Sequence, residues 1–336
     1  RLDEIISVVG PVAAPAAGAR SVPGRPYLST QNDTVASATE TGVVYLGQTA
    51  LNLGTVTLKI ALPTDAVTGD VVRLFVDGVE FAHQALTSGY SNTNKTLSLS
   101  VPIDKLGTAS AQASAVALSA AVDTASGIKG VESRALPLVL DNGVSAPVVS
   151  LQASGTDVSG VADSATVASL PWLKLSQIET GASVHITVAL GNQVYTKDIS
   201  SVTNGELVSL SSVVTSPLAG AYTITVTQTD RAGNVSALST THVTLDTVAP
   251  VPILSPLNGN DTYLTAAEAA QYSQSLSVQG KASGDVVTAQ VVNKATGQVP
   301  TGVNLTVTDS LVSGDLSSLP DGAYTVRVTA RDAVHA

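Results

Sequence analysis

Apolar and polar residues alternate with a period of two along several stretches of the chain. From Tyr222 to Val226 a threonine separates each pair of apolar residues, which is the pattern of a β-strand with one buried face. The uninterrupted apolar runs, such as residues 135–140, are much shorter than the ~20 residues that a membrane-spanning helix needs. The pattern therefore predicts an all-β chain with no membrane insertion in this segment.

One sequence plan recurs three times along the chain. A proline, two apolar residues and a serine occur at residues 26–29, 147–150 and 252–255, at intervals close to the ~100 residues of one immunoglobulin-like β-sandwich. Before the second and third copies an apolar strand ends in an aspartate, Asp141 or Asp246, and a short linker ends in Ala-Pro. We therefore expect tandem immunoglobulin-like β-sandwich domains, each with its own core.

The copies also place the expected domain boundaries. Residues 220–230 match residues 322–332, which aligns the end of the second domain with the end of the third. After this match the second domain continues into one more strand, whereas the third has no further strand. We expect a linker or the end of a preceding domain at residues 1–25, immunoglobulin-like domains at residues 26–143 and 144–247, and a truncated third domain at residues 248–336.

Acidic residues recur at fixed spacing within the copies. The sequence Asn-Asp-Thr is followed by a glutamate in the first copy, giving Asp33 and Glu40, and in the third copy, giving Asp261 and Glu268. The second copy lacks this pair, but its residues 230–234, Asp-Arg-Ala-Gly-Asn, have the composition of a tight loop. Carboxylates repeated in this way are candidate metal ligands.

Two segments of the second copy carry a family resemblance. Thr-Asp-Arg-Ala-Gly-Asn-Val-Ser at residues 229–236 and Val-Thr-Leu-Asp-Thr-Val-Ala-Pro at residues 243–250, followed by Asn-Asp-Thr and Ala-x-Glu, resemble the bacterial immunoglobulin-like repeats of large biofilm-associated and RTX-type surface adhesins. The resemblance covers nearly the whole chain from Pro26 onward. It implies spacers in fibres at the bacterial cell surface with calcium at the domain junctions, and related sandwiches also build surface layers.

Calcium suits these acidic residues because it binds several oxygen ligands and tolerates the irregular geometry of loops. We expect it first at the junction between domains two and three, and with weaker support at the junction between domains one and two. In an alternative interpretation Asp230 and Asn234 only form a turn and Asp246 only ends a strand. The candidate ligands are Asp246, Asp230, Asn234, Asp261 and Glu268 at the second junction, Asp141 and Asp123 at the first, and the repeat equivalents Asp33, Glu40 and Asp332.

The composition argues against several other classes of protein. The chain has no cysteine, which excludes disulfides and thiolate metal sites. Its net charge of −10 argues against a nucleic-acid partner. The four histidines are scattered, and no Gly-x-Ser-x-Gly, His-Glu-x-x-His or phosphate-loop motif occurs, so we expect no enzymatic activity. We expect His185 and His242 at the surface, Trp172 in packing, and Tyr222 and Tyr324 as corner tyrosines.

These features predict an extracellular structural or adhesive region of a bacterial cell-surface protein. It would serve as a calcium-stiffened spacer in an adhesin fibre or as a self-assembling unit of a surface lattice. Its expected partners are copies of itself or neighbouring repeats, together with surface glycans or other cells. The alternative is a set of carbohydrate-binding accessory domains from a secreted glycan-active protein, which the 3% aromatic content disfavours.

Overall fold

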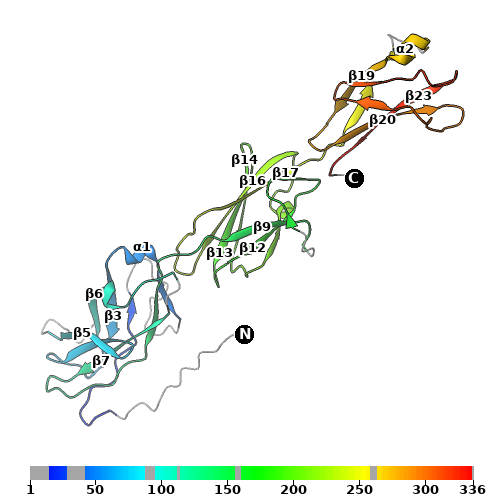
Figure 1. Ribbon diagram of the computed structural model, residues 1–336. Coiled ribbons are helices and arrows are strands. Elements are labelled where there is room, and N and C mark those ends of the chain that lie inside the picture. Colours follow the sequence, from blue (N-terminus) through cyan, green and yellow to red (C-terminus); the bar gives the residue numbers. More distant parts are fainter. Residues whose placement is uncertain are drawn as a thin grey trace.

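The computed structural model describes residues 15–28, 42–87, 95–111, 114–155, 160–257 and 263–334. Strands dominate these residues and form three successive units along the chain, as Figure 1 shows. The predicted fold class, all-β tandem immunoglobulin-like sandwiches, is confirmed. No helix within the described ranges has the length and apolar character needed to cross a membrane.

The first unit packs a three-stranded sheet, of order β1-β3-β6, against a five-stranded sheet, of order β2-β8-β7-β4-β5. The apolar side chains of both sheets form one core between residues 28 and 140. Its elements are β1 (Tyr27–Leu28), β2 (Val44–Leu46), α1 (Gln48–Leu51), β3 (Thr55–Ala61), β4 (Val71–Val76), β5 (Val79–Ala85), β6 (Thr96–Pro102), the 3-10 turn η1 (Ile103–Lys105), β7 (Val116–Asp123) and β8 (Leu136–Leu140).

The second unit repeats this plan with sheets of order β10-β9-β12-β15 and β11-β17-β16-β13-β14. Its core lies between residues 151 and 245. Its elements are β9 (Val148–Gln152), β10 (Gly160–Val161), β11 (Ala165–Val167), β12 (Trp172–Ser176), β13 (Ser183–Leu190), β14 (Gln193–Ile199), β15 (Leu207–Ser209), the 3-10 turn η2 (Leu210–Ser212), β16 (Gly220–Thr229) and β17 (Ser239–Leu245).

The third unit has a sheet of order β18-β19-β22-β21 facing the pair β20-β23. In the described residues no strand pairs with the second edge of β23, whereas its counterpart β16 pairs with β17 on that side. The fully buried part of this core is small. The elements are β18 (Val251–Leu254), α2 (Ala266–Ala270), β19 (Tyr272–Gln279), β20 (Val286–Asn293), β21 (Leu305–Val307), β22 (Leu311–Gly314) and β23 (Tyr324–Arg331).

Both tyrosines of the repeated strand act as corner residues, as predicted. The Tyr222 hydroxyl donates to the carbonyl oxygen of Leu218 at 2.8 Å and accepts from its amide at 3.0 Å. The Tyr324 hydroxyl donates to the carbonyl oxygen of Pro320 at 3.0 Å. Tyr222 is fully buried, whereas Tyr324 is half-buried. β17 pairs with the edge of β16, whereas no described strand pairs with the corresponding edge of β23.

Some residues upstream of Pro26, where the sequence suggested a linker or the end of a preceding domain, pack on the first unit. Arg20 forms an ion pair with the fully buried Asp70, with 2.7 Å between Nε and Oδ2. The amide of Gly24 donates to the carbonyl oxygen of Ala61 at 2.8 Å. These contacts extend the first unit to residues before Pro26.

Candidate metal centre at the first junction

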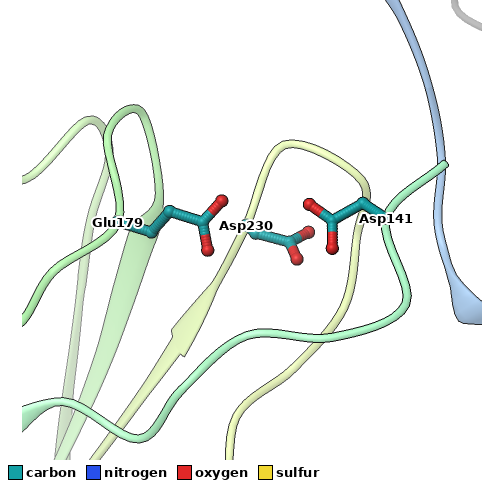
Figure 2. A group of neighbouring side chains, drawn as sticks. All are labelled: Asp141, Glu179 and Asp230. Carbon is teal, nitrogen blue, oxygen red and sulfur yellow. The ribbon is translucent and has the colours of Figure 1, made fainter. Parts of the chain in front are cut away.

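Three carboxylates from two units meet where the first unit joins the second. Asp141, Glu179 and Asp230 each offer one carboxylate oxygen, and these atoms all lie within 4.8 Å of one another. Figure 2 shows the three side chains together. Asp141 directly follows β8 of the first unit, while Glu179 precedes β13 and Asp230 follows β16 of the second. The group therefore bridges the two units and could hold a metal ion.

The strand before Asp141 positions its backbone. The Asp141 amide donates to the carbonyl oxygen of Leu46 at 2.9 Å, which continues the parallel pairing of β2 with β8. The carboxylate then points out of the end of the first sandwich, yet Asp141 is only 4% exposed. Its burial comes from the loop of the second unit that lies against it.

That loop, residues 230–234, is the tight turn that the sequence predicted after the tyrosine strand. The amide of Asp230 donates to the carbonyl oxygen of Asn234 at 3.1 Å, and the Asn234 amide returns to Asp230 Oδ1 at 2.9 Å. Gly233 takes a φ of +83°, a conformation that favours glycine. The turn thus directs the Asp230 carboxylate and the Asn234 amide toward the first unit.

The side chain of Asn234 bonds to Asp230 in its own unit and to Asp141 and Gln48 in the first unit. Its Nδ2 donates to Asp230 Oδ2 at 2.8 Å and to the carbonyl oxygen of Asp141 at 3.1 Å. Its Oδ1 accepts from the amide of Gln48, at the start of α1, at 2.7 Å. Asn234 is 8% exposed, so these bonds replace the water that this amide loses at the junction.

Gly47 lets the loop approach the first unit closely. A Cβ on this residue would lie 2.2 Å from the carbonyl oxygen of Ala232, a distance that no side chain tolerates. The backbone of Gly47 itself is extended, with φ −81°, so glycine is needed here for space and not for conformation. Nearby, Arg231 Nη1 donates to the Tyr45 hydroxyl at 3.3 Å.

The three carboxylates repel one another in a partly dry site. Burial raises the pKa of Asp141, and the neighbouring charge of Asp230 raises it further. Burial also raises the pKa of Glu179, with further contributions from the charges of Asp141 and Asp230 that Arg231 partly offsets. Both shifts mean that the ionised carboxylates lack sufficient positive charge around them, which a bound cation would supply.

Asp123 does not belong to this group. It was proposed as the first-unit equivalent of Asp230, but the strand registers place it one residue earlier. Its carboxylate is held within the first unit by Arg73 at 2.8 Å and Lys129 at 2.7 Å. Because two internal cations already compensate its charge, Asp123 is not a free metal ligand.

The true equivalents of Asp230 and Asn234 in the first unit are Thr124 and Ile128. The amide of Thr124 donates to the carbonyl oxygen of Ile128 at 3.0 Å, and the Ile128 amide returns to the threonine hydroxyl at 2.9 Å. The loop is therefore the same, but its ligand-bearing side chains are replaced. Of these two units, only the second presents a carboxylate and an amide from this turn.

The expectation that Asp230 and Asn234 lie with Asp246 at the second junction was wrong. The 230–234 loop precedes β17 and Asp246 directly follows this strand, so the two lie at opposite ends of the sandwich. The loop faces the preceding unit and Asp246 faces the next one. Asp246 is equivalent to Asp141, since its amide bonds to the carbonyl oxygen of Val167 at 2.9 Å in the same way. Its Oδ1 accepts from the amide of Val248 at 3.0 Å.

The second junction keeps only part of the constellation. Asp332 is buried at the position of Asp230, and its Oδ1 accepts from the amide of Val334 at 2.8 Å. Ala282 occupies the position of Glu179. The amide of Asp285 donates to the carbonyl oxygen of Ala282, just as the amide of Ala182 donates to that of Glu179. Glycine is also missing there, since the β11 register places Ala168 at the position of Gly47.

The remaining sequence candidates do not join the triad. Glu268 is the third residue of α2 and forms a capping box with Thr265, whose amide donates to Glu268 Oε2 at 2.7 Å. In Figure 1, α2 lies at the end of the third unit that points away from the second. Asp33, Glu40 and Asp261 lie outside the described residues.

Glu179 and Gly47 were not identified from the sequence. Glu179 occurs in a turn of the second domain without the repeated spacing that drew attention to the other acids. Nothing local marks Gly47 either, because its role depends on a loop that is distant in the chain but adjacent in space. The neighbouring hydrogen bond from Gln48 to Asn234, for example, joins residues that are 186 positions apart.

The histidines expected at the surface are found there. The side chains of His185 and His242 are 48% and 47% exposed. His185 lies 2.6 Å from Asp198, and His242 lies 3.5 Å from Asp163. Each pair is open to solvent.

Comparisons with known proteins address the family. No curated protein matches the chain significantly. Among solved structures, a bacterial ice-binding adhesin studied for host cell surface retention is 18% identical and has a TM-score of 0.33, with 86% of this chain and 93% of that chain covered. A tetra-tandem repeat from the extending region of a large adhesion protein is 18% identical, with a TM-score of 0.31 and coverage of 92% and 70%.

A third structure contains the fibronectin(III)-like modules of CbhA from Clostridium thermocellum, which are 11% identical, with a TM-score of 0.30 and coverage of 66% of this chain and 93% of that chain. The match at the level of sequence families falls on the second unit. Residues 143–247, which contribute Glu179, Asp230 and Asn234, match the family described as Bacterial Ig-like domain. The middle unit of this chain is therefore a bacterial Ig-like domain.

Proposed function

We propose that this chain is an extended structural segment of a bacterial cell-surface adhesin, in which calcium between Asp141, Glu179 and Asp230 holds the first two units at a fixed angle. The observation that carries the proposal is the position of the three carboxylates, which lie within 4.8 Å of one another and come from both sides of one junction. A cation bound there contacts both units at once. Its removal leaves like charges facing each other across the junction.

Calcium fits the donor set better than other common cations do. All three side-chain donors are carboxylates, and all three residues lie outside helices and strands. Hard oxygen donors of this kind suit calcium or magnesium, and calcium accepts the irregular geometry of loop ligands more readily. Zinc would be expected to recruit histidine or cysteine, and none takes part in this group.

A structural role also explains how the rest of the surface is built. Trp172, the only tryptophan, is half-buried on β12, and its ring lies 3.0 Å from the position of a Cβ on Gly155. It therefore packs against the backbone and does not stand free as a platform for a sugar ring. This packing favours a spacer over the carbohydrate-binding alternative.

The two junctions are expected to behave differently in the fibre. The first junction has the triad, the Asn234 bridge and Gly47, while the second has Ala282 and Ala168 at two of these positions. A segment of this kind would combine one stiff connection with one more mobile connection. That combination suits a spacer that must extend from a cell surface and still bend.

Calcium titration by calorimetry tests the proposal. The intact chain should bind calcium at the first junction, and Glu179→Gln should weaken this binding by about tenfold or more, which corresponds to about 1.4 kcal/mol. Asp198→Asn is the matched control, because Asp198 is a carboxylate of the same unit that is 82% exposed and outside the triad. Absence of calcium binding, or an equal loss in both variants, would refute the calcium site.

Sedimentation in calcium separates the spacer from the surface lattice. A spacer stays monomeric at high protein concentration, whereas a lattice unit associates with copies of itself as calcium is added. If the protein forms large assemblies as calcium is added, a surface lattice and not a spacer is its function. Binding to purified surface glycans or to whole cells would then be measured on the same preparations.

A further inference from the structure

An Asn-Gly pair follows the triad directly. Asn142 and Gly143 come immediately after Asp141 and lie in the linker between the first two units, where the backbone has no regular secondary structure. Asn142 is exposed, and its one described bond, from Nδ2 to the carbonyl oxygen of Ala109, has a length of 3.5 Å, the outer limit of a hydrogen bond. The side chain is therefore weakly held.

The backbone amide of Gly143 is hydrogen-bonded to a carboxylate. Its N–H donates to the Asp141 carboxylate at 3.2 Å. A Cβ at Gly143 would meet no atom within 4 Å, so the space around this peptide is open. An attacking nitrogen with an adjacent carboxylate and free space around it favours closure of a five-membered ring by the asparagine side chain.

A second Asn-Gly pair in the same chain is held quite differently. The amide of Gly205 donates to the carbonyl oxygen of Leu175 at 2.7 Å, and the side chain Oδ1 of Asn204 accepts from the amide of Ile178 at 3.3 Å. A turn bond of 3.1 Å from Glu206 to Thr203 closes the loop around the pair. Both the nucleophile and the electrophile are therefore restrained.

We infer that Asn142 is a site of spontaneous deamidation that converts the linker of the first junction to aspartate or isoaspartate. The Gly143 nitrogen attacks Cγ of Asn142 and forms a new N–Cγ bond. Its proton passes by way of the Asp141 carboxylate and water to Nδ2, and the Cγ–Nδ2 bond breaks to release ammonia. Water then opens the succinimide at either carbonyl. Asn204, with the same following residue, converts more slowly in the folded chain because both reacting groups are restrained.

The modification changes the junction in two ways. It adds a fourth carboxylate beside Asp141, Glu179 and Asp230, which increases the negative charge of the group. When the product is isoaspartate, it also lengthens the backbone between the two units by one carbon atom. An aged chain is therefore expected to depend more strongly on cations at this junction than a new one.

Peptide mass spectrometry of the incubated folded chain tests the inference, with an isoaspartate-specific methyltransferase as a second readout. The peptide with Asn142 should convert at least about tenfold faster than the peptide with Asn204, a barrier difference of about 1.4 kcal/mol. In denaturant the two sites should convert at similar rates, because both are Asn-Gly pairs without a folded environment. Equal rates in the folded chain, or a persistent difference in denaturant, would overturn the inference.

Two variants test the chemistry. Gly143→Ala fits the structure without a clash and should slow conversion of Asn142 about tenfold by crowding the attacking nitrogen, again about 1.4 kcal/mol, while Asn204 remains unchanged. Asp141→Asn should also slow conversion of Asn142. No effect of Gly143→Ala would overturn the ring-closure step, and faster reaction in Asp141→Asn would show that the carboxylate only restrains the linker.

Discussion

Replacement of Gly47 by alanine should separate the first two units without unfolding either of them. The added Cβ would lie 2.2 Å from the carbonyl oxygen of Ala232, so the 230–234 loop must move away from the start of α1. The backbone of Gly47 is extended and accepts alanine without strain. The variant is therefore a steric wedge that acts at the junction and leaves both cores intact.

The cost can be estimated from the bonds that the wedge breaks. The amide of Gln48 loses its 2.7 Å bond to Asn234 Oδ1, worth about 1 kcal/mol, and Asn234 loses its bond to the backbone of Asp141, worth a similar amount. If the bond to the Asp141 carboxylate at 3.3 Å also breaks, about 1 to 2 kcal/mol more is lost. We therefore expect the junction to lose about 2 to 4 kcal/mol.

Two measurements check this prediction. Hydrogen exchange should show lost protection of the Gln48 amide, and small-angle scattering should show a larger maximum dimension. Unfolding of the middle unit, followed through the fluorescence of Trp172, should remain cooperative with a lower midpoint because the docked neighbour no longer supports it. Gly143→Ala is the matched control, since its Cβ meets nothing within 4 Å. An unchanged Gln48 amide in Gly47→Ala would show that the loop does not approach α1 as closely as described.

The other predictions concern pH and the tyrosine corner. The pKa values of Asp141 and Glu179 are raised in the closed junction. Closure without calcium is therefore favoured at mildly acidic pH, weakens as the pH rises through these raised pKa values, and is weakest at neutral pH. Small-angle scattering in chelator at mildly acidic and at neutral pH measures this, and identical profiles would contradict it. Tyr222→Phe removes the hydroxyl that bonds Leu218 in both directions and should lower the stability of the middle unit by about 1 to 3 kcal/mol, whereas Tyr324→Phe, at a half-buried position, should cost its own unit less in the same denaturation assay.

The sequence alone determined the local structure and the repetition. Alternation from Tyr222 to Val226 was sufficient for the strand β16, because one face of a strand must be apolar to pack and its period is two. The turn of residues 230–234 was also predictable, because aspartate, glycine and asparagine each favour a step of it. Corner tyrosines followed from the same repeated strand.

The tertiary structure decided which acids meet. Asp141 and Asp230 were both recognised as candidates, but their partnership depends on the end of one sandwich docking on the opposite end of the next. Alignment by sequence placed Asp123 at the position of Asp230, and only the strand register showed that Thr124 lies there. Strand patterns and turns arise from interactions between near neighbours in the chain, whereas the junction arises from shape and charge across two folded surfaces, which no local pattern encodes.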